Sequence, residues 1–258
     1  MLFVIDVGNT NVVLGVFDDK KLIAHWRLSS QHKQTVDEWG ILARNLFSHE
    51  KIDPLEIDGL IISSVVPPLD TVLEQMANRY FNLTAQFVRP ESQTKMAVRY
   101  EQPHDVGADR IVNAVAAFEN YGGPCIVVDF GTATTFDAIS AGGEYIGGVI
   151  APGIGIAAEA LYLRTARLPR VDIREPQRVI GRDTVGSMQS GLYYGYLSLV
   201  DGILERMIKE LGPATRVVAT GGYAELLAKG SKYIQHMNPI LMLEGLRLMW
   251  EHRRAGGR

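Results

Sequence analysis

Two segments of the chain carry residues whose types and spacing suit the binding of phosphate and a cation. In each, an aspartate follows an apolar run and a glycine stands two residues later: Asp6 with Gly8, and Asp129 with Gly131. The glycine lets the backbone turn sharply and approach a ligand without a Cβ in the way. The carboxylate suits Mg²⁺, which favours one or two carboxylates together with water and substrate phosphates. Each segment therefore predicts a turn that binds phosphate and places an acid beside it.

The two segments also match each other. VIDVGNTNVVLGVF (Val4–Phe17) aligns without a gap on VVDFGTATTFDAIS (Val127–Ser140), at an offset of 123 residues in a chain of 258. A single copy would be as typical of an ordinary β-hairpin, but two copies separated by half the chain indicate an internal duplication that forms a phosphate clamp. Short side chains that can help backbone N–H groups to hold phosphate follow both glycines: Asn9, Thr10, Asn11, Thr132, Thr134 and Thr135.

The elements that must position these turns are those of an α/β protein. Helical spacing of apolar residues predicts one helix after a capping box at Thr35–Glu38, one after Pro68 and one from near Ala108 to Tyr121. We expect two domains, 1–121 and 122–258, and leave open whether the last helix packs back on the first half. Apolar runs predict strands at 2–5, 12–17, 22–28, 59–66, 86–89, 125–128, 136–140 and 145–150, with 130–135 as a polar turn.

Composition excludes several classes of protein. Apolar residues make up 47 % and charged residues 21 %, with a mean hydropathy of +0.03, which is typical of a globular chain. The net charge of −3 gives no overall electrostatic basis for binding nucleic acid, a local patch aside. No apolar run reaches the roughly 20 residues of a membrane span, and the start of the chain does not resemble a signal peptide. One cysteine, Cys125, excludes an intramolecular disulfide and favours a reducing compartment. Together these observations lead us to expect a cytoplasmic protein that has neither nucleic acid nor a membrane as partner.

Five motifs then follow one another along the whole chain. They are DxGNTN at Asp6–Asn11, GADR at Gly107–Arg110, DFGTATTxD at Asp129–Asp137, GGxIxPG at Gly147–Gly153 and LEGLR at Leu243–Arg247. In this order they resemble the motifs of the type III pantothenate kinases, within the acetate/sugar kinase–Hsp70–actin superfamily. The turn Thr220-Gly-Gly222 is similar to that superfamily's nucleoside-contacting turn.

The resemblance implies a fold, a reaction and a set of site residues. The fold would be two duplicated ribonuclease-H-like halves, as in actin-like ATPases, with a nucleotide cleft between them. The reaction would be ATP-dependent phosphorylation of pantothenate to 4'-phosphopantothenate, the first step of coenzyme A biosynthesis, by a homodimer that uses Mg²⁺ and a monovalent cation (K⁺ or NH₄⁺). Implied residues for ATP are Asp6, Val7, Gly8, Asn9, Thr10, Asn11, Val12, Val13 and Thr132. Those for pantothenate are Tyr100, Gly107, Ala108, Asp109, Arg110 and Thr184.

Three aspartates have particular roles in this hypothesis. Asp109 matches the aspartate of the GADR motif and is the implied general base, and a carboxylate at the start of a helix is held ionised. Taken alone, Asp109 would be more typical of a helix cap with Arg110 as its surface partner. Asp129 is the implied ligand of the monovalent cation, and Asp6 is the expected partner of Mg–ATP.

Other interpretations remain open at this point. Gly153–Ala158 fits the dinucleotide motif GxGxxA, although two prolines and no second buried strand follow it within Ala166–Arg178. A non-catalytic regulator and an actin- or chaperone-like ATPase are the alternatives from other classes. Cys125 is expected to be a buried inert thiol, and the tyrosines of Tyr193–Tyr196 are expected in the core or a subunit interface.

Overall fold

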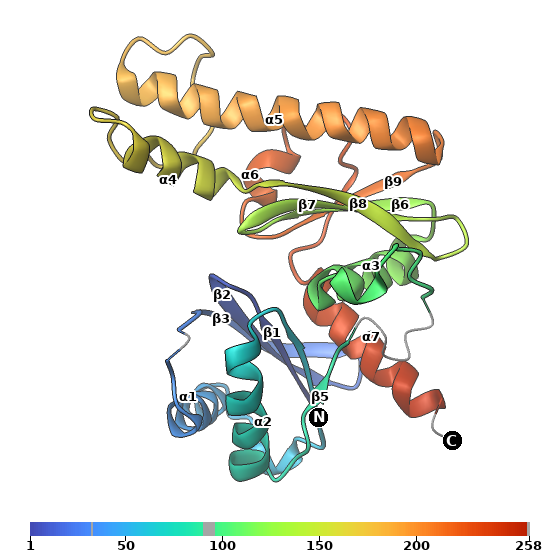
Figure 1. The fold of residues 1–258 in the computed structure, drawn as a ribbon. Coiled ribbons are helices and arrows are strands. Elements are labelled where there is room, and N and C mark those ends of the chain that lie inside the picture. The colour runs from blue at the N-terminus through green and yellow to red at the C-terminus, as the bar shows by residue number, and fades with distance from the viewer. Residues whose placement is uncertain (32, 90–95, 257–258) are drawn as a thin grey trace. The chain divides into compact units, whose positions relative to one another are not determined.

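The computed structural model describes residues 1–31, 33–89 and 96–256, which form two compact units (Figure 1). The first unit comprises Met1–Met96, Tyr100–Ala116 and Met242–Arg258, and the second comprises Ala97–Arg99 and Ala117–Leu241. The division between the two units runs through the helix α3 (Ala108–Tyr121). The boundary between 121 and 122 that we expect for the duplication stays a prediction.

The first unit is built on a five-stranded sheet with the strand order β3-β2-β1-β4-β5. The central strand β1 pairs antiparallel with β2 and parallel with β4. Pairing between β2 and β3 is antiparallel, and pairing between β4 and β5 is parallel. The strands are β1 (Leu2–Val7), β2 (Asn11–Asp18), β3 (Lys21–Ser29), β4 (Gly59–Ser64) and β5 (Gln86–Phe87).

The second unit repeats this topology in a sheet of order β10-β9-β6-β7-β8. Its central strand β6 pairs antiparallel with β7 and parallel with β9, as β1 does with β2 and β4. Along both central strands every residue is buried except the fifth, which is Asp6 in β1 and Asp129 in β6. The equivalence confirms the duplication expected from the sequence. The strands are β6 (Cys125–Phe130), β7 (Ala133–Ile139), β8 (Tyr145–Pro152), β9 (Arg216–Thr220) and β10 (His236–Met237).

The polar turn expected at 130–135 is wrong in its extent. Phe130 already pairs with Thr134, which leaves three residues between the paired ends, whereas the turn between β1 and β2 leaves four. The gapless alignment therefore holds up to the turn, and after the turn it is one residue out of step with the structural equivalence of β2 and β7. Thr134 is buried and Thr135 lies within β7, so neither belongs to the turn. Threonine suits strands as well as turns, and composition alone could not distinguish the two.

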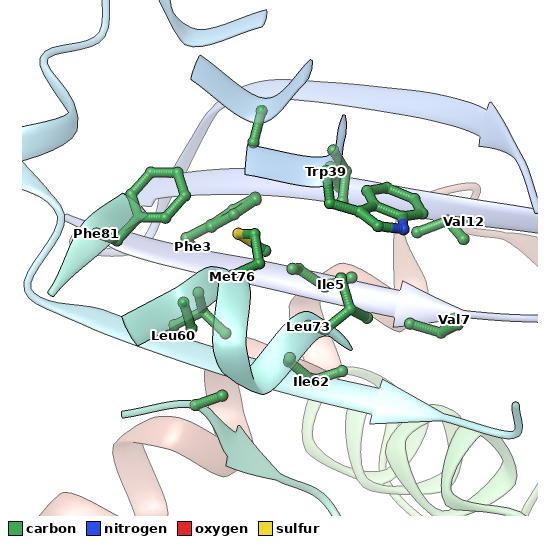
Figure 2. Close-up of a cluster of buried hydrophobic side chains, with 14 of the residues drawn as sticks. Phe3, Ile5, Val7, Val12, Trp39, Leu60, Ile62, Leu73, Met76 and Phe81 are labelled. Carbon is green, nitrogen blue, oxygen red and sulfur yellow. The ribbon is translucent and has the colours of Figure 1, made fainter. Parts of the chain in front are cut away.

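Helices cover one face of the first sheet and enclose its main core (Figure 2). Alternate residues of β1, such as Phe3 and Ile5, are fully buried together with Trp39 of α1 and Leu73 of α2. Each large apolar side chain buried in this way contributes about 1.5–3 kcal/mol. The two helices are α1 (Val36–His49) and α2 (Pro67–Phe81).

Local sequence explains where these helices begin. The capping box expected at the start of α1 is present: the N–H of Glu38 donates to Thr35 Oγ1 at 3.3 Å, and the N–H of Thr35 donates to Glu38 Oε2 at 2.7 Å. Pro67 opens α2, where its missing N–H costs nothing. The first unit also holds the 3₁₀ turns Pro54–Glu56 and Pro103–Asp105.

From Met242 onward, the last helix, α7 (Leu241–Gly256), belongs to the first unit, where it packs on the other face of the sheet. A Cβ on Gly59 would lie 2.3 Å from the Trp250 ring, and one on Gly245 would lie 2.4 Å from the Val112 carbonyl oxygen of α3. Glycine at these positions allows the close approach of α7 to β4 and α3.

Helices also cover one face of the second sheet. Phe130, Phe136 and Val217 on that face pack with Leu192 and Val200 of α5 in a second core. The helices are α4 (Ile154–Arg164), α5 (Thr184–Leu211) and α6 (Ala224–Ala228). In the part of the chain that the structure describes, no helix combines the length and apolarity needed to cross a bilayer.

Candidate functional site

The turn between β1 and β2 is closed by its glycine. The Gly8 N–H donates to the Asn11 carbonyl oxygen at 2.9 Å, and a Cβ on Gly8 would lie 3.0 Å from that oxygen. Asn9 and Thr10 are exposed at the tip of the turn. Their amide and hydroxyl groups can donate to an anion together with backbone N–H groups.

Asp6 stands at the entrance to this turn, on the sheet face opposite the core. Its neighbours Ile5 and Val7 both belong to the buried cluster, and side chains alternate between faces along a strand. Asp6 is partly exposed and lies in register with Ser63 of β4. The carboxylate therefore lies at the carboxyl ends of β1 and β4, the edge at which open α/β sheets bind ligands.

Three valines predicted to contact ATP have different environments. Val7 and Val12 are fully buried in the core, so only their main-chain atoms can face a ligand. The Val7 carbonyl is already used, because it accepts the Val65 N–H at 3.0 Å. Val13 is partly buried and lies in register with Asp6. These valines serve mainly to hold the turn on the sheet.

Val65 also connects the turn with the GADR segment, within the first unit. Its Cγ1 lies 3.7 Å from the position that a Cβ on Gly107 would take, and its N–H is bonded to Val7. The predicted phosphate turn and the segment of the predicted base therefore meet at one edge of the first sheet. No motif singled out Val65, because an apolar residue after a strand carries no functional signal.

Asp109 is the second residue of α3 and is partly buried. Its Oδ1 accepts the N–H of Arg110 at 2.9 Å and lies 2.4 Å from the position that a Cβ on Gly107 would take, so a side chain at 107 would displace it. Ala108 and Arg110 on either side are buried, with 6 % and 8 % of their surface exposed. Asp109 thus lies inside the first helical turn rather than at the N-cap position.

Two opposing effects act on the proton affinity of Asp109. Burial disfavours the charged carboxylate and raises its pKa above the ordinary value of 3.8, while the backbone N–H and the positive charge of Arg110 lower it. Burial is the larger effect, so the pKa is raised. A carboxyl group with raised pKa is a stronger base than an exposed aspartate, which suits proton abstraction.

The second copy of the turn brings Asp129 against a different backbone. In β9, Thr220 is in register with Asp129, and the chain then passes through Gly221 at φ +93°. A Cβ on Gly221 would lie 2.4 Å from Asp129 Oδ1 and 2.7 Å from the Phe130 backbone. The Thr220–Gly222 turn therefore packs directly on the carboxylate, and only glycine allows it.

The donors around Asp129 fit a hard cation. Thr135 of β7 and Thr220 of β9 stand in register with Asp129 on both sides, which places three oxygen-bearing side chains on adjacent strands. Oxygen donors suit K⁺ and Mg²⁺ rather than the softer metals. Among the described residues, no group of three His, Cys, Asp or Glu could hold a metal ion by itself. A cation here would complete its shell with hydroxyl, carbonyl, water or phosphate oxygens.

Thr132 lies exposed at the tip of the second turn, where it could reach an anion. Its carbonyl oxygen accepts the Gly153 N–H at 3.1 Å, and a Cβ on Gly153 would lie 2.2 Å from the same oxygen. Gly153 thus lets the start of α4 pack on this turn. Residues 165–183 after α4 contain no strand, so the GxGxxA motif is not part of a βαβ dinucleotide unit.

The remaining residues predicted to bind pantothenate lie in two places. Tyr100 is 36 % exposed and belongs to the first unit together with the GADR segment. Thr184 belongs to the second unit, where it is the exposed first residue of α5, after the N-cap Asp183. It lines an open, mainly apolar groove of about 1080 Å³ between α4 and α5.

Two further sequence predictions are confirmed. Cys125 is buried, and burial raises the pKa of its thiol to about 12, so it is inert at neutral pH. Tyr193 and Tyr196 are buried in the core between the second sheet and α5.

The duplicated sheets and their paired Asp–x–Gly turns define the class of actin-like ATPase-fold proteins. Solved structures show the same fold. An activator of 2-hydroxyisocaproyl-CoA dehydratase from Clostridium difficile, with bound ADPNP, is 10 % identical with a TM-score of 0.56, covering 99 % of this chain and 97 % of that one. The ethanolamine utilization protein EutJ from Carboxydothermus hydrogenoformans is 16 % identical with a TM-score of 0.56, covering 95 % and 88 %.

Sequence comparison narrows the class to one family. The family model of the type III pantothenate kinases matches residues 2–206. A type III pantothenate kinase from Koribacter versatilis is 59 % identical over all of this chain and 98 % of its own length, and one from Solibacter usitatus is 54 % identical over 97 % and 96 %. The chain belongs to the type III pantothenate kinase family and is a kinase.

Proposed function

We propose that this kinase transfers the γ-phosphoryl group of ATP to the terminal hydroxyl of pantothenate, in the first step of coenzyme A biosynthesis. The pantothenate oxygen forms a bond to the γ-phosphorus as the bond from that phosphorus to the β,γ-bridging oxygen breaks and ADP leaves. The hydroxyl proton passes to a carboxylate oxygen of Asp109. Family membership over the whole chain supports the reaction and both substrates.

The environment of Asp109 supports its proposed role as the base. Its carboxyl group has a pKa raised by burial, accepts the backbone N–H of Arg110, feels the positive charge of that residue and lies at the same sheet edge as the Asp6–Asn11 turn. Phosphoryl transfer depends mainly on positioning and on neutralising charge, and the base needs only to accept a proton late in the transfer. A carboxylate of raised proton affinity beside a permanent positive charge fits both needs.

The other site residues position the two substrates. The turn Gly8–Asn11, with the backbone of Val7, Val12 and Val13, would hold phosphate oxygens of ATP, and Thr132 would add a donor from the second copy. Arg110 would engage an anionic group through two parallel hydrogen bonds. The Tyr100 ring and hydroxyl and the Thr184 hydroxyl would bind pantothenate.

Two cations complete the proposal. Asp6 would be the carboxylate nearest to Mg–ATP, and Asp129, with its flanking threonine hydroxyls, would bind the monovalent ion. When bound, these ions supply positive charge that neutralises the phosphates. A homodimer and a cytoplasmic location also remain part of the proposal. Exposed apolar side chains of the second unit support a subunit interface: Ile156, Leu163, Val179, Ile180 and Val185.

The test is ADP release by the purified protein, with and without pantothenate, in Mg²⁺ and K⁺, with the product identified by mass spectrometry. We expect ADP release to depend on pantothenate and the product to be 4'-phosphopantothenate. Equal ADP release in both cases would favour the ATPase alternative. No release in either case would favour the regulator. Pantothenyl alcohol, which lacks the carboxylate, serves as a matched substrate and should bind more weakly if Arg110 or the GADR amides hold that group.

A further inference from the structure

Tyr145, the first residue of β8, binds residues 97–99 on the side of β8 that does not pair with β7. Its N–H donates to the Ala97 carbonyl oxygen at 2.9 Å, and its carbonyl accepts the Arg99 N–H at 2.8 Å. Val98 between them forms a parallel bridge with Tyr145. All these residues belong to the second unit. The three residues 97–99 are thus attached to the edge of the second sheet through Tyr145.

The side chain of Tyr145 ends on a buried acid. Its hydroxyl donates to Asp137 Oδ1 at 2.8 Å, and Thr135 Oγ1 donates to Asp137 Oδ2 at 3.3 Å. Tyr145 and Asp137 are both fully buried. A buried carboxylate is costly unless donors satisfy it, so the tyrosine hydroxyl and the carboxylate each fix the position of the other. The cluster has no part in the proposed proton transfer.

A second connection strengthens the same attachment. The Arg99 guanidinium contacts Glu144 Oε1 at 2.8 Å through Nε and at 2.7 Å through a terminal nitrogen. Glu144 directly precedes Tyr145, and its N–H donates to Ser140 Oγ at 3.1 Å. Residues 97–99 are therefore held by two main-chain bonds and one ion pair.

We propose that Tyr145 and Asp137 are positioning residues for pantothenate, acting through residues 97–99 on Tyr100. Arg99 is covalently followed by Tyr100, and the GADR segment begins seven residues later. Because Arg99 directly precedes Tyr100, holding Arg99 against Tyr145 restricts the backbone immediately before Tyr100. The attachment of residues 97–99 to Tyr145, called the anchor below, is rigid because of the buried Tyr145–Asp137 pair. If the Tyr145 ring changed rotamer, the Asp137 carboxylate would lose its hydroxyl donor. The inference rests on the proposed role of Tyr100.

The test compares Tyr145→Phe with a matched variant, Tyr80→Phe. Tyr80 donates to Asp37 at 2.7 Å between α2 and α1, so this control removes the same kind of bond far from residues 97–99 in sequence. In Tyr145→Phe, we expect kcat/KM for pantothenate to fall about 5- to 50-fold, mostly through KM, the scale expected for a misplaced substrate contact. The KM for ATP should stay within about twofold in the same variant. Tyr80→Phe should leave both KM values unchanged.

Hydrogen exchange gives a second readout that needs no activity. In Tyr145→Phe, amides of the peptide covering 97–106 should exchange faster than in the wild type, and Tyr80→Phe should leave them unchanged. If Tyr145→Phe does not fold, Glu144→Gln weakens the ion pair to the same segment and should give a smaller effect of the same kind.

Several outcomes would overturn the inference. One is unchanged exchange at 97–106. Another is faster exchange with parallel changes in the KM values for ATP and pantothenate, which would indicate a general structural role. If the wild type does not phosphorylate pantothenate at all, the proposed function fails, and faster exchange at 97–106 would then support only the anchor.

Discussion

Replacing Asp109 by asparagine should lower activity and at the same time stabilise the fold. Asparagine keeps the size of the side chain, and its carbonyl can still accept the N–H of Arg110, as Asp109 does at 2.9 Å. It cannot accept the proton of the substrate hydroxyl. Loss of a general base costs about 10²- to 10⁴-fold in kcat, and we expect a loss in this range with little change in the KM for ATP.

The gain in stability follows from the direction of the pKa shift. Burial raises the pKa of Asp109 in the folded protein above its ordinary value of 3.8. Between these two pKa values the folded state binds more protons than the unfolded state, so stability falls as the pH rises. Below 3.8 both states are protonated and the cost is absent; above the folded pKa it is fully present. Asp109→Asn removes this cost, so its advantage over the wild type should grow from pH 4 towards neutrality.

A stabilising role for the charge of Asp109 at the start of α3 predicts the opposite result. Asparagine keeps the hydrogen bond to Arg110 but loses the negative charge, and loss of a charge from the first turn of a helix costs about 0.3–1 kcal/mol. Each kcal/mol corresponds to about 2–4 °C in Tm for a domain of 150–250 residues. The assay is therefore thermal unfolding from pH 4 to 8 together with steady-state kinetics. Asp105→Asn, an exposed aspartate four residues away, is the control and should change neither quantity. A lower Tm with near-wild-type kcat in Asp109→Asn would refute the reasoning.

Other predictions concern the two turns and the arginine. Asp129→Asn should weaken activation by K⁺ and leave the Mg²⁺ requirement intact, whereas Asp6→Asn should raise the Mg²⁺ concentration needed for activity. Titrations of activity with each cation measure both effects. The same response in the two variants would refute the division of roles between the two aspartates. Gly221→Ala should impair K⁺ activation as Asp129→Asn does, because its Cβ would lie 2.4 Å from Asp129 Oδ1 at φ +93°. In Gly142→Ala the Cβ meets only Ser140 Oγ at 3.8 Å, so this variant should behave as the wild type. Arg110→Lys should lower kcat/KM for pantothenate, because lysine cannot copy a two-bond contact; an unchanged value would place this arginine outside the site.

Much of the fold could be predicted because the local signals agree with the global one. The apolar runs at 2–5 and 125–128 form the central strands, and Thr35–Glu38 forms the predicted cap. The self-match between the two Asp–x–Gly segments predicted two sheets of equal topology. These features depend on residues close together in sequence, for which periodicity and turn chemistry are sufficient information.

The contacts that complete the site could not be predicted, because they depend on main-chain atoms and on pairs distant in sequence. Val65 meets Gly107 across 42 residues, and Gly221 meets Asp129 across 92. The spacing of residues in the sequence indicates neither contact. The raised pKa of Asp109 could not be predicted either. A helix N-terminus alone stabilises the carboxylate and would lower the pKa, and only the packing shows that burial has the larger, opposite effect.

The shorter second turn gives a physical reason why two copies of one unit would take different tasks. In the first copy, four residues separate the paired strand ends, and Asn9 and Thr10 stand exposed where they can surround phosphate oxygens. In the second, three residues remain, and the turn is packed from outside by Gly153. Its aspartate meets the Gly221 backbone and two threonines in register, a set of oxygen donors that suits a cation better than an anion. Under the proposed roles, the four-residue turn would hold phosphate and the three-residue turn would support a carboxylate beside a cation. Restoring the missing residue by an insertion after Thr132 should then weaken the K⁺ dependence before it affects the fold.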